Sequence, residues 1–259
     1  MSDRPVVLVT GAARRLGREI ALDLAAHGFD VAVHYRSSRA DAEETVALAR
    51  QRGAFADGVA ADLAHEASCR QVVPQVLARF GRLDAIVNNA STFEYDNAES
   101  FHLASMERHW RANTAPAVLL AQGLHRHLAG TPRHGCVVNL LDQKLWNLNP
   151  DYFSYTLSKA ALQTATVMLA QALAPAVRVC GVAPGVTLLS GPMTADEFAA
   201  SHQLTPLERS STPEDIARTV RFLIESPAIT GTTLLVDGGQ HLQPQPRDVM
   251  FIANPNKEI

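Results

Sequence analysis

The chain has 259 residues, 47% of them hydrophobic, a formal net charge of −3 and a pI of about 6.4. This length and apolar content suit one large α/β domain better than two small ones. The sequence has no basic stripe, no Cys/His zinc spacing and no run of 18 apolar residues, so we expect no nucleic-acid partner, no metal and no membrane partner. The chain enters an apolar strand within its first residues, which leaves no room for a signal peptide. We therefore expect a cytoplasmic protein with Cys136 and Cys180 reduced in its core.

Short β-branched runs alternate with helix-forming segments along the whole chain. The expected strands cover residues 5–10, 31–35, 55–60, 83–89, 136–141, 177–182 and 232–236. The expected helices cover residues 18–27, 41–50, 66–80, 105–128 and 155–173, and one more begins at Thr212. This alternation predicts a doubly wound parallel sheet of Rossmann type with helices on both faces.

Two stretches depart from this alternation. Residues 187–211 read as a looser segment, and residues 243–259 form a Pro-rich end that we expect to be partly ordered. Neither a repeat nor a domain boundary is visible, so residues 1–259 are interpreted as a single domain.

The first strand-turn-helix unit carries a nucleotide-binding pattern. Gly11 and Gly17 allow the backbone to approach a pyrophosphate, and the helix amino terminus supplies unpaired N–H groups. Arg36 lies 19 residues after Gly17, where an NAD-binding protein usually carries an acidic residue for the ribose hydroxyls. Arg36 with the Ser37 hydroxyl suits a 2′-phosphate instead, which predicts NADP(H) as the cofactor. The alternative is that Arg36 is a solvated charge at a strand end.

Tyr155 and Lys159 are four residues apart at the start of a helix, so their side chains share one helix face. We expect the ammonium to lower the pKa of the phenol and make it a usable general acid. Asp142 ends an apolar strand thirteen residues earlier, at the sheet edge where α/β active sites form. The alternative for the pair is a surface contact near a helix start.

Several motifs in one order resemble the short-chain dehydrogenase/reductase family. They are Thr10-Gly11 with Gly17, Asn88-Asn89-Ala90, Asn113, Tyr155 with Lys159, Pro184-Gly185 and Val236-Asp237-Gly238-Gly239. The resemblance implies about seven parallel strands, a homotetramer and hydride transfer with Tyr155 as the proton donor. It further implies that Lys159 binds the nicotinamide ribose and that Asn113 holds a water in the proton relay.

Three departures from the usual family pattern resemble the pteridine reductase branch, which includes bacterial dihydromonapterin reductases. They are Arg15 in place of Gly, Ser91 followed by Phe93, and Asp142 in place of Ser. That branch implies that Phe93 stacks on a pterin, that Arg15 and Ser91 contact the pterin or the cofactor phosphates, and that Asp142 and Tyr155 manage protons. The alternatives are loop packing for Phe93, a capping role for Asp142 and a surface position for Arg15.

The resemblance implies a complete site. The implied cofactor-binding residues are Gly11, Arg14, Arg15, Leu16, Gly17, His34, Tyr35, Arg36, Ser37, Asp62, Leu63, Asn89, Ala90, Ser91, Tyr155, Lys159, Pro184, Gly185 and Thr187. The implied substrate-binding residues are Arg15, Ser91, Phe93, Asp142 and Tyr155.

These residues predict an NADPH-dependent reductase of dihydropterins, such as dihydromonapterin or dihydrofolate, with a small pterin or folate as its partner. Reduction of a C=N bond needs a hydride at carbon and a proton at nitrogen, and a flat heteroaromatic substrate favours an aromatic wall. One alternative is a carbonyl reductase or alcohol dehydrogenase of the same family. Another is an NADP-binding regulatory protein without catalysis.

Overall fold

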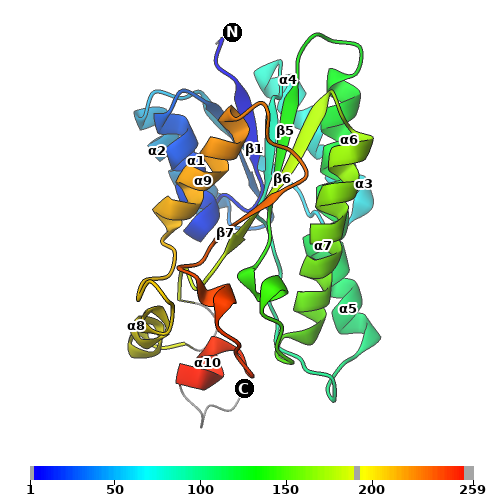
Figure 1. The fold of residues 1–259 in the computed structure, drawn as a ribbon. Coiled ribbons are helices and arrows are strands. Elements are labelled where there is room, and N and C mark those ends of the chain that lie inside the picture. Colours follow the sequence, from blue (N-terminus) through cyan, green and yellow to red (C-terminus); the bar gives the residue numbers. More distant parts are fainter. Residues whose placement is uncertain (1–2, 190–192, 254–259) are drawn as a thin grey trace.

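The computed structural model of the chain describes residues 3–189 and 193–253, and it is built on one parallel sheet (Figure 1). The strands are β1 (Val6–Val9), β2 (Asp30–Tyr35), β3 (Ala56–Ala60), β4 (Ala85–Asn88), β5 (Gly135–Leu140), β6 (Val177–Pro184) and β7 (Thr233–Val236). Their order across the sheet is β3-β2-β1-β4-β5-β6-β7, and every neighbouring pair is parallel. The predicted seven-stranded fold class is confirmed.

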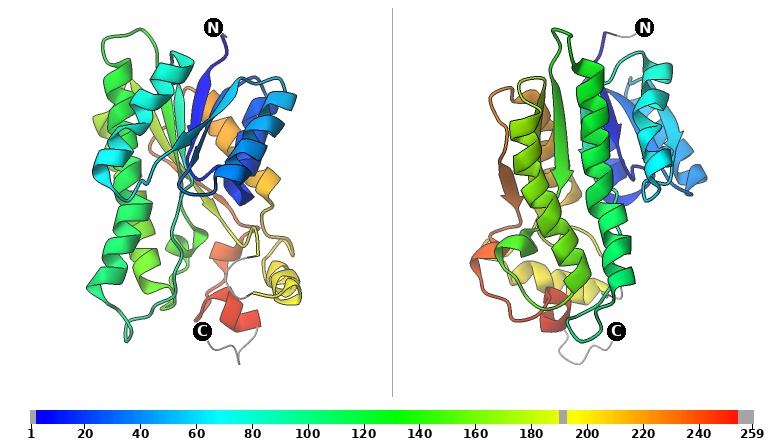
Figure 2. Two further views of the ribbon diagram at one scale, coloured as in Figure 1. Left: turned by 180° about the vertical axis from the view of Figure 1, so that it is seen from behind. Right: turned by 90° about the vertical axis from the view of Figure 1, so that its right-hand side faces the viewer.

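Helices cover both faces of this sheet. They are α1 (Arg15–Ala26), α2 (Arg39–Gln51), α3 (Glu66–Arg70), α4 (Val72–Phe80), α5 (Leu103–His109), α6 (Ala115–Leu128), α7 (Phe153–Ala172), α8 (Ala195–Gln203), α9 (Pro213–Glu225) and α10 (Val249–Ala253). The described residues also form one π-helical segment, η1 (Trp110–Thr114), and two 3₁₀-helical segments, η2 (Gln143–Trp146) and η3 (Gln240–Leu242). Helices α1, α2 and α9 pack on one face, and α4, α6 and α7 pack on the other (Figures 1 and 2).

Two of the predicted helices are interrupted near prolines. The helix expected over residues 66–80 is divided at Gln71, because Pro74 has no N–H and its ring crowds the carbonyl of residue 70. The helix expected over residues 105–128 begins earlier, at Leu103, and contains the π turn η1 just before Pro116. Since Pro116 donates no hydrogen bond to the preceding turn, the wider turn is tolerated there.

The remaining differences concern helix ends and the two looser stretches. Helix α1 begins at Arg15, three residues before the expected start. The stretch 187–211 contains α8, which Thr194 and Glu197 begin with reciprocal hydrogen bonds to each other's backbone N–H. The Pro-rich end contributes α10 and follows directly after η3, while residues 190–192 and 254–259 lie outside the described part.

The site is positioned by the point where the strand order reverses, between β1 and β4. The Thr10 hydroxyl accepts hydrogen bonds from the backbone N–H groups of Asn89 (2.9 Å) and Ala90 (3.0 Å), and the Asn89 side chain donates to Thr10 O (2.9 Å). These bonds tie the two loops together across the reversal, where open α/β sheets bind their ligands. Among the described helices none is long and apolar enough to cross a bilayer.

Candidate active site

A cavity of about 430 Å³ lies at the carboxyl ends of β1, β2 and β3. It is lined by Gly11, Arg14, Arg15, Leu16, Gly17, His34, Tyr35, Arg36, Ser37, Asp62, Leu63, Asn89, Ala90 and Ser91, all of them predicted cofactor residues. The glycines are required by close packing: a Cβ on Gly17 would lie 2.3 Å from Gly11 O, and Gly11 itself has φ +63°. The backbone can therefore approach a ligand closely at this turn.

His34 supports the glycine turn from below. Its Nδ1 accepts a hydrogen bond from the Gly11 N–H (3.1 Å), and its Nε2 lies 3.1 Å from the Ala61 carbonyl oxygen. Burial lowers the pKa of His34 to about 4, so the imidazole is neutral near pH 7 and donates from Nε2 to Ala61. Both ring nitrogens of His34 are hydrogen-bonded to backbone groups. His34 therefore holds the glycine turn in place, although it also lines the cavity.

A second cavity of about 310 Å³ adjoins the first, below the carboxyl ends of β5 and β6. The predicted residues that line it are Phe93, Asp142, Tyr155, Lys159, Pro184, Gly185 and Thr187. Arg15, Leu16, Asn89 and Ser91 line both cavities, so the two are neighbours along one groove. A long ligand lying in the first cavity would bring one end to Tyr155.

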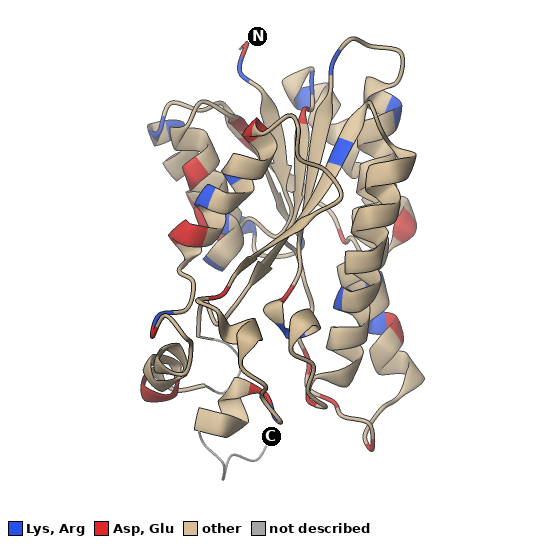
Figure 3. Cartoon of the chain, in the orientation of Figure 1, with Lys and Arg blue, Asp and Glu red and all other residues tan. Residues whose placement is uncertain are grey.

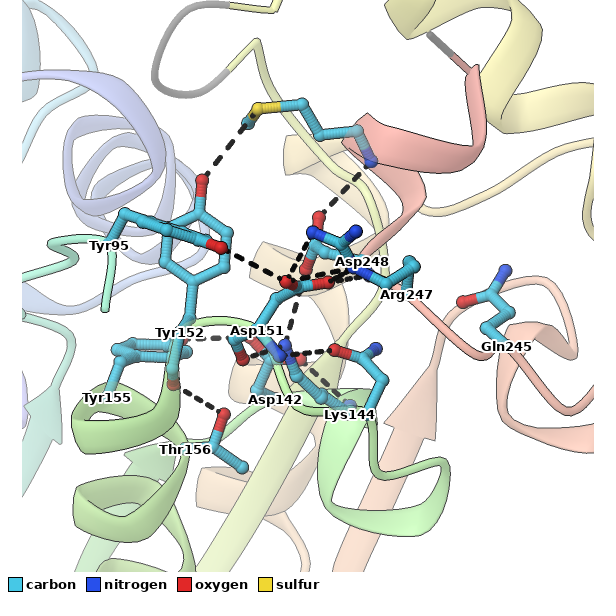
Figure 4. A network of polar contacts seen from close by, with 12 residues as sticks. Tyr95, Asp142, Lys144, Asp151, Tyr152, Tyr155, Thr156, Gln245, Arg247 and Asp248 are labelled. Atoms are coloured by element: carbon cyan, nitrogen blue, oxygen red, sulfur yellow. Dashed lines mark hydrogen bonds and ion pairs between the residues drawn. The ribbon is translucent and has the colours of Figure 1, made fainter. Parts of the chain in front are cut away.

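Tyr155 and Asp142 are joined directly. The buried phenol hydroxyl donates a 2.8 Å hydrogen bond to Asp142 Oδ2, while Asp142 Oδ1 accepts from the Lys144 N–H (2.9 Å) at the start of η2 (Figure 4). Asp142 is thus both a cap and the partner of Tyr155. Burial and the Asp142 carboxylate raise the pKa of Tyr155 well above its usual value.

The pKa of Tyr155 is thus raised, whereas the sequence predicted a net decrease toward working pH. The Lys159 ammonium donates to Leu140 O (2.7 Å) and lies 5.7 Å from the centre of the phenol ring, farther away than the hydrogen-bonded carboxylate. Burial lowers the pKa of Lys159 itself to about 8. Burial and the neighbouring carboxylate therefore hold the phenol proton on Tyr155.

Asn113 lies in η1 and lines neither cavity. Its Oδ1 accepts from Thr92 N (2.7 Å) and the Ser91 hydroxyl (3.1 Å), and its Nδ2 donates to Thr92 O (3.0 Å) and the Ser158 hydroxyl (2.9 Å). The side chain therefore fixes the loop after β4 against α7. Its expected role in holding a water stays a prediction.

Phe93 forms part of the wall of the cavity that Asp142 and Tyr155 also line. Its ring stacks on Tyr152 with the centroids 4.1 Å apart, meets Tyr155 edge-on at 4.7 Å, and leaves 40% of the residue exposed. Packing against Tyr152 and a free surface toward the cavity therefore coexist. The aromatic wall is held in place before any ligand arrives.

Arg15 occupies an unusual backbone position. It has φ +55°, a conformation that costs a residue with a Cβ about 1–2 kcal/mol. Its Nη2 donates to Leu189 O (2.5 Å), and the residue lines both cavities. The glycine that the family usually has at this position adopts positive φ without steric cost. In this chain the position is taken by Arg15, which carries a positive charge.

A further group of lining residues was missed in the sequence: Lys144, Gln240, Gln245, Asp248 and Met250. Lys144 Nζ donates to Asp151 O (2.5 Å) and lies 3.5 Å from Asp248 Oδ2, while Arg247 forms a paired contact with the Asp151 carboxylate (2.8 Å) (Figure 4). The proximity of Lys144 to Asp142 in the chain was a usable signal. The carboxyl-terminal residues carry no local motif, because only the fold returns them to the site.

The comparisons with known proteins agree with this geometry. The family model described as enoyl-(acyl carrier protein) reductase matches residues 11–241. The crystal structure of FolM alternative dihydrofolate reductase 1 from Brucella suis in complex with NADP is 42% identical, with a TM-score of 0.89, and the match covers 94% of this chain and 97% of that one.

Two curated relatives have different names. Pteridine reductase 1 of Leishmania tarentolae is 32% identical over 280 residues, covering 92% of this chain and 96% of its own. A 3-oxoacyl-(acyl-carrier-protein) reductase of Synechocystis is 33% identical over 244 residues, covering 90% and 96%. The pteridine reductase branch predicted from the motifs is thus among the relatives. Because the family model and these relatives span nearly all of the sequence, the chain belongs to the short-chain dehydrogenase/reductase family of NAD(P)-dependent oxidoreductases.

Proposed function

We propose that the protein is an NADPH-dependent reductase of dihydropterins that acts on a C=N bond. The observation that carries this proposal is the 2.8 Å hydrogen bond from the Tyr155 hydroxyl to Asp142, in a cavity with Phe93 on its wall. The Asp142 carboxyl group can exchange a proton with the phenol next to it. Such a pair of proton-exchanging groups suits a reaction that protonates a ring nitrogen. The exposed part of the Phe93 ring suits a flat heteroaromatic substrate.

The groove fits the proposed cofactor. The glycine turn and the amino terminus of α1 offer N–H groups to a pyrophosphate, and Arg36 and Ser37 are exposed at the end of β2. No carboxylate stands at that strand end to bind ribose hydroxyls, so a 2′-phosphate is the ligand that Arg36 favours. The relative from Brucella suis was crystallised with NADP, in support of this assignment.

The residues divide the reaction into a hydride step and a proton step. NADPH, when bound in the groove, supplies the hydride that forms the new C–H bond at C6 of the pterin. The electron pair of the C=N bond moves to N5, where it takes the proton of the Tyr155 hydroxyl. The buried Lys159 ammonium stabilises the phenolate that is left, and the phenolate regains a proton from solvent by way of Asp142.

A carbonyl reductase is the second candidate. The 3-oxoacyl-(acyl-carrier-protein) reductase of Synechocystis supports it, because the match extends over most of both chains. The residue at position 142 opposes it: the family usually places a neutral serine there to polarise a carbonyl, whereas a carboxylate repels the negative charge that develops on the carbonyl oxygen.

NADPH oxidation against dihydropterins, dihydrofolate, a 3-oxoacyl thioester and simple ketones tests these candidates. We expect turnover of dihydropterins, a loss of about 10²–10⁴-fold in rate for Tyr155→Phe, and a fall of at least about tenfold in kcat/KM for Asp142→Asn. Asp142→Ser should shift preference toward carbonyl substrates. A parent enzyme that reduces the thioester but no pterin is a carbonyl reductase, and one that binds NADPH without any turnover is a regulatory protein.

A further inference from the structure

One end of the substrate cavity is lined by three amide side chains and a carboxylate. It is formed by η2, η3 and the segment that leads into α10, and we call Gln143, Gln240, Gln245 and Asp248 the acceptor wall. The three amides are at least nine-tenths buried, yet the Oε1 atoms of Gln143 and Gln240 have no partner among the described residues. These two oxygens are themselves enclosed, whereas the Asp248 carboxylate of the wall is partly exposed and suits a ligand that brings hydrogen-bond donors.

The charge at this wall comes from Asp248. The Lys144 ammonium, 4% exposed, sits between Asp151 O and Asp248 Oδ2, and the Asp151 carboxylate is already paired with Arg247 (Figure 4). Asp248 therefore balances Lys144, and 19% of its side chain remains exposed. Replacing Asp248 with a neutral residue would leave a buried ammonium without its counter-ion.

The other basic side chains of the cavity are also engaged. Among the described residues that line it, Lys159 donates to Leu140 O (2.7 Å) and Arg15 donates to Leu189 O (2.5 Å). Two carboxylates, those of Asp142 and Asp248, face the same space. At the acceptor wall itself, the Asp248 carboxylate faces the cavity, and the cation beside it, Lys144, is already paired with that carboxylate.

The reaction places the substrate side chain close to this wall. In the proposed function N5 receives the proton of Tyr155, and the side chain of a dihydropterin is attached to the adjacent C6. Asp248 and Tyr155 line the same cavity of about 310 Å³. A C6 substituent therefore lies within reach of both Asp142 and the acceptor wall.

We propose that Asp248, at the acceptor wall, selects the substrate side chain. The wall binds the hydroxyl groups of a neutral side chain and disfavours a side chain that ends in carboxylates. This inference rests on the proposed function and extends it by naming a specificity-determining residue.

Asp248→Asn tests the role of the charge with little change in shape. Asparagine keeps the oxygen that accepts from the Met250 N–H (3.2 Å) at the start of α10. The ratio of kcat/KM for dihydrobiopterin, which is neutral and hydroxylated, to that for dihydrofolate should fall by about tenfold, mainly through a lower KM for dihydrofolate. Glu94→Gln is the matched control, since Glu94 is exposed, pairs with Arg108 (3.1 Å) and does not line the cavity; its ratio should equal that of the parent.

Gln240→Glu approaches the same question from the opposite direction. It adds a carboxylate to the wall and should raise the ratio, and it keeps the proposal testable if Asp248→Asn fails to fold by circular dichroism. Ratios that stay at the parental value in both variants, with both substrates reduced, would overturn the inference alone. A parent enzyme that reduces neither compound would overturn the proposed function and this inference with it.

Discussion

The proton between Tyr155 and Asp142 is controlled by burial as much as by charge. A phenol buried beside a carboxylate keeps its proton, so in the free enzyme Tyr155 is a weak acid with its proton directed at Asp142 Oδ2. Lys159 is buried as well, and its nearest hydrogen-bond acceptor is a carbonyl rather than the phenol. Release of the proton must therefore be driven by the substrate nitrogen, which removes it as the hydride arrives.

The pH profile of kcat/KM should show this dependence on Lys159. Burial lowers the pKa of Lys159 from 10.5 to about 8, so the ammonium is present below pH 8 and is lost as the pH rises through that value. Without the cation the phenolate is not stabilised, and kcat/KM should fall by about tenfold per pH unit above the break. Measurement between pH 6 and 10 checks this, and Lys159→Arg should remove the break from whatever activity it retains. A profile that is flat to pH 10 contradicts it.

Cofactor preference should depend on Arg36. One charge-assisted contact to a 2′-phosphate is worth about 1.5–3 kcal/mol, or roughly tenfold to a hundredfold in preference. Arg36→Ala should therefore reduce the ratio of kcat/KM for NADPH to that for NADH by this factor. Arg39→Ala is the matched control, because Arg39 is also exposed, pairs with Glu43 (2.8 Å) and lies outside the cavity lining. Equal ratios in the parent and in Arg36→Ala would show that Arg36 is only a solvated charge.

At the scale of elements, the first residue of α1 has a strained backbone that lowers the stability of the fold and places a charged side chain at the groove. Arg15 is the first residue of the helix and has φ +55°, whereas the preceding Arg14 has φ −156° and is extended. The backbone strain is confined to Arg15. This strained conformation places the Arg15 side chain where it lines both cavities. Backbone strain held at a site in this way indicates a functional constraint.

Arg15→Gly should make the fold more stable and the enzyme less effective. The free energy of unfolding in urea should rise by about 1 kcal/mol, because glycine adopts positive φ without a steric cost. KM for a dihydropterin should rise because the cation is lost. Arg14→Gly is the control, and it should give no gain in stability because the backbone there is extended. A loss of stability in Arg15→Gly would mean that the hydrogen bond to Leu189 outweighs the strain.

At the scale of the whole molecule, α7 has an outward face without charge. Its single charged residue is Lys159, which is buried, and the helix is otherwise free of charged side chains (Figure 3). Leu157, Val167 and Met168 are 43%, 38% and 63% exposed on it. An exposed apolar face of this kind marks a protein–protein interface, and we propose that it joins subunits of a homotetramer.

Light scattering at micromolar concentration should give the mass of four chains of 28.0 kDa each. Met168→Glu places a charge in the proposed interface and should reduce the mass to that of a smaller species. Leu207→Glu introduces the same charge at a residue that is 74% exposed outside α7 and should leave the mass unchanged. A monomeric parent would refute the proposal.

Much of the fold and of the candidate site is determined by local sequence. The strands are short apolar runs, the Gly11–Gly17 turn needs glycine for steric reasons, and Tyr155 and Lys159 share a helix face through their four-residue spacing. Such features depend on backbone geometry within a few residues. For that reason the sheet, the groove-lining residues and the helix that carries Tyr155 could be predicted without the structure.

The tertiary structure alone decided the electrostatics of the site and the identity of its far wall. The pKa of Tyr155 rises because the fold buries the phenol against Asp142, which no spacing in the chain reveals. Asp248 and Gln240 reach the cavity because the segment after β7 returns across it and is held by the contacts of Lys144 and Arg247. Desolvation and through-space charge depend on which segments meet, and residues about a hundred positions apart in the chain meet only once the fold is complete.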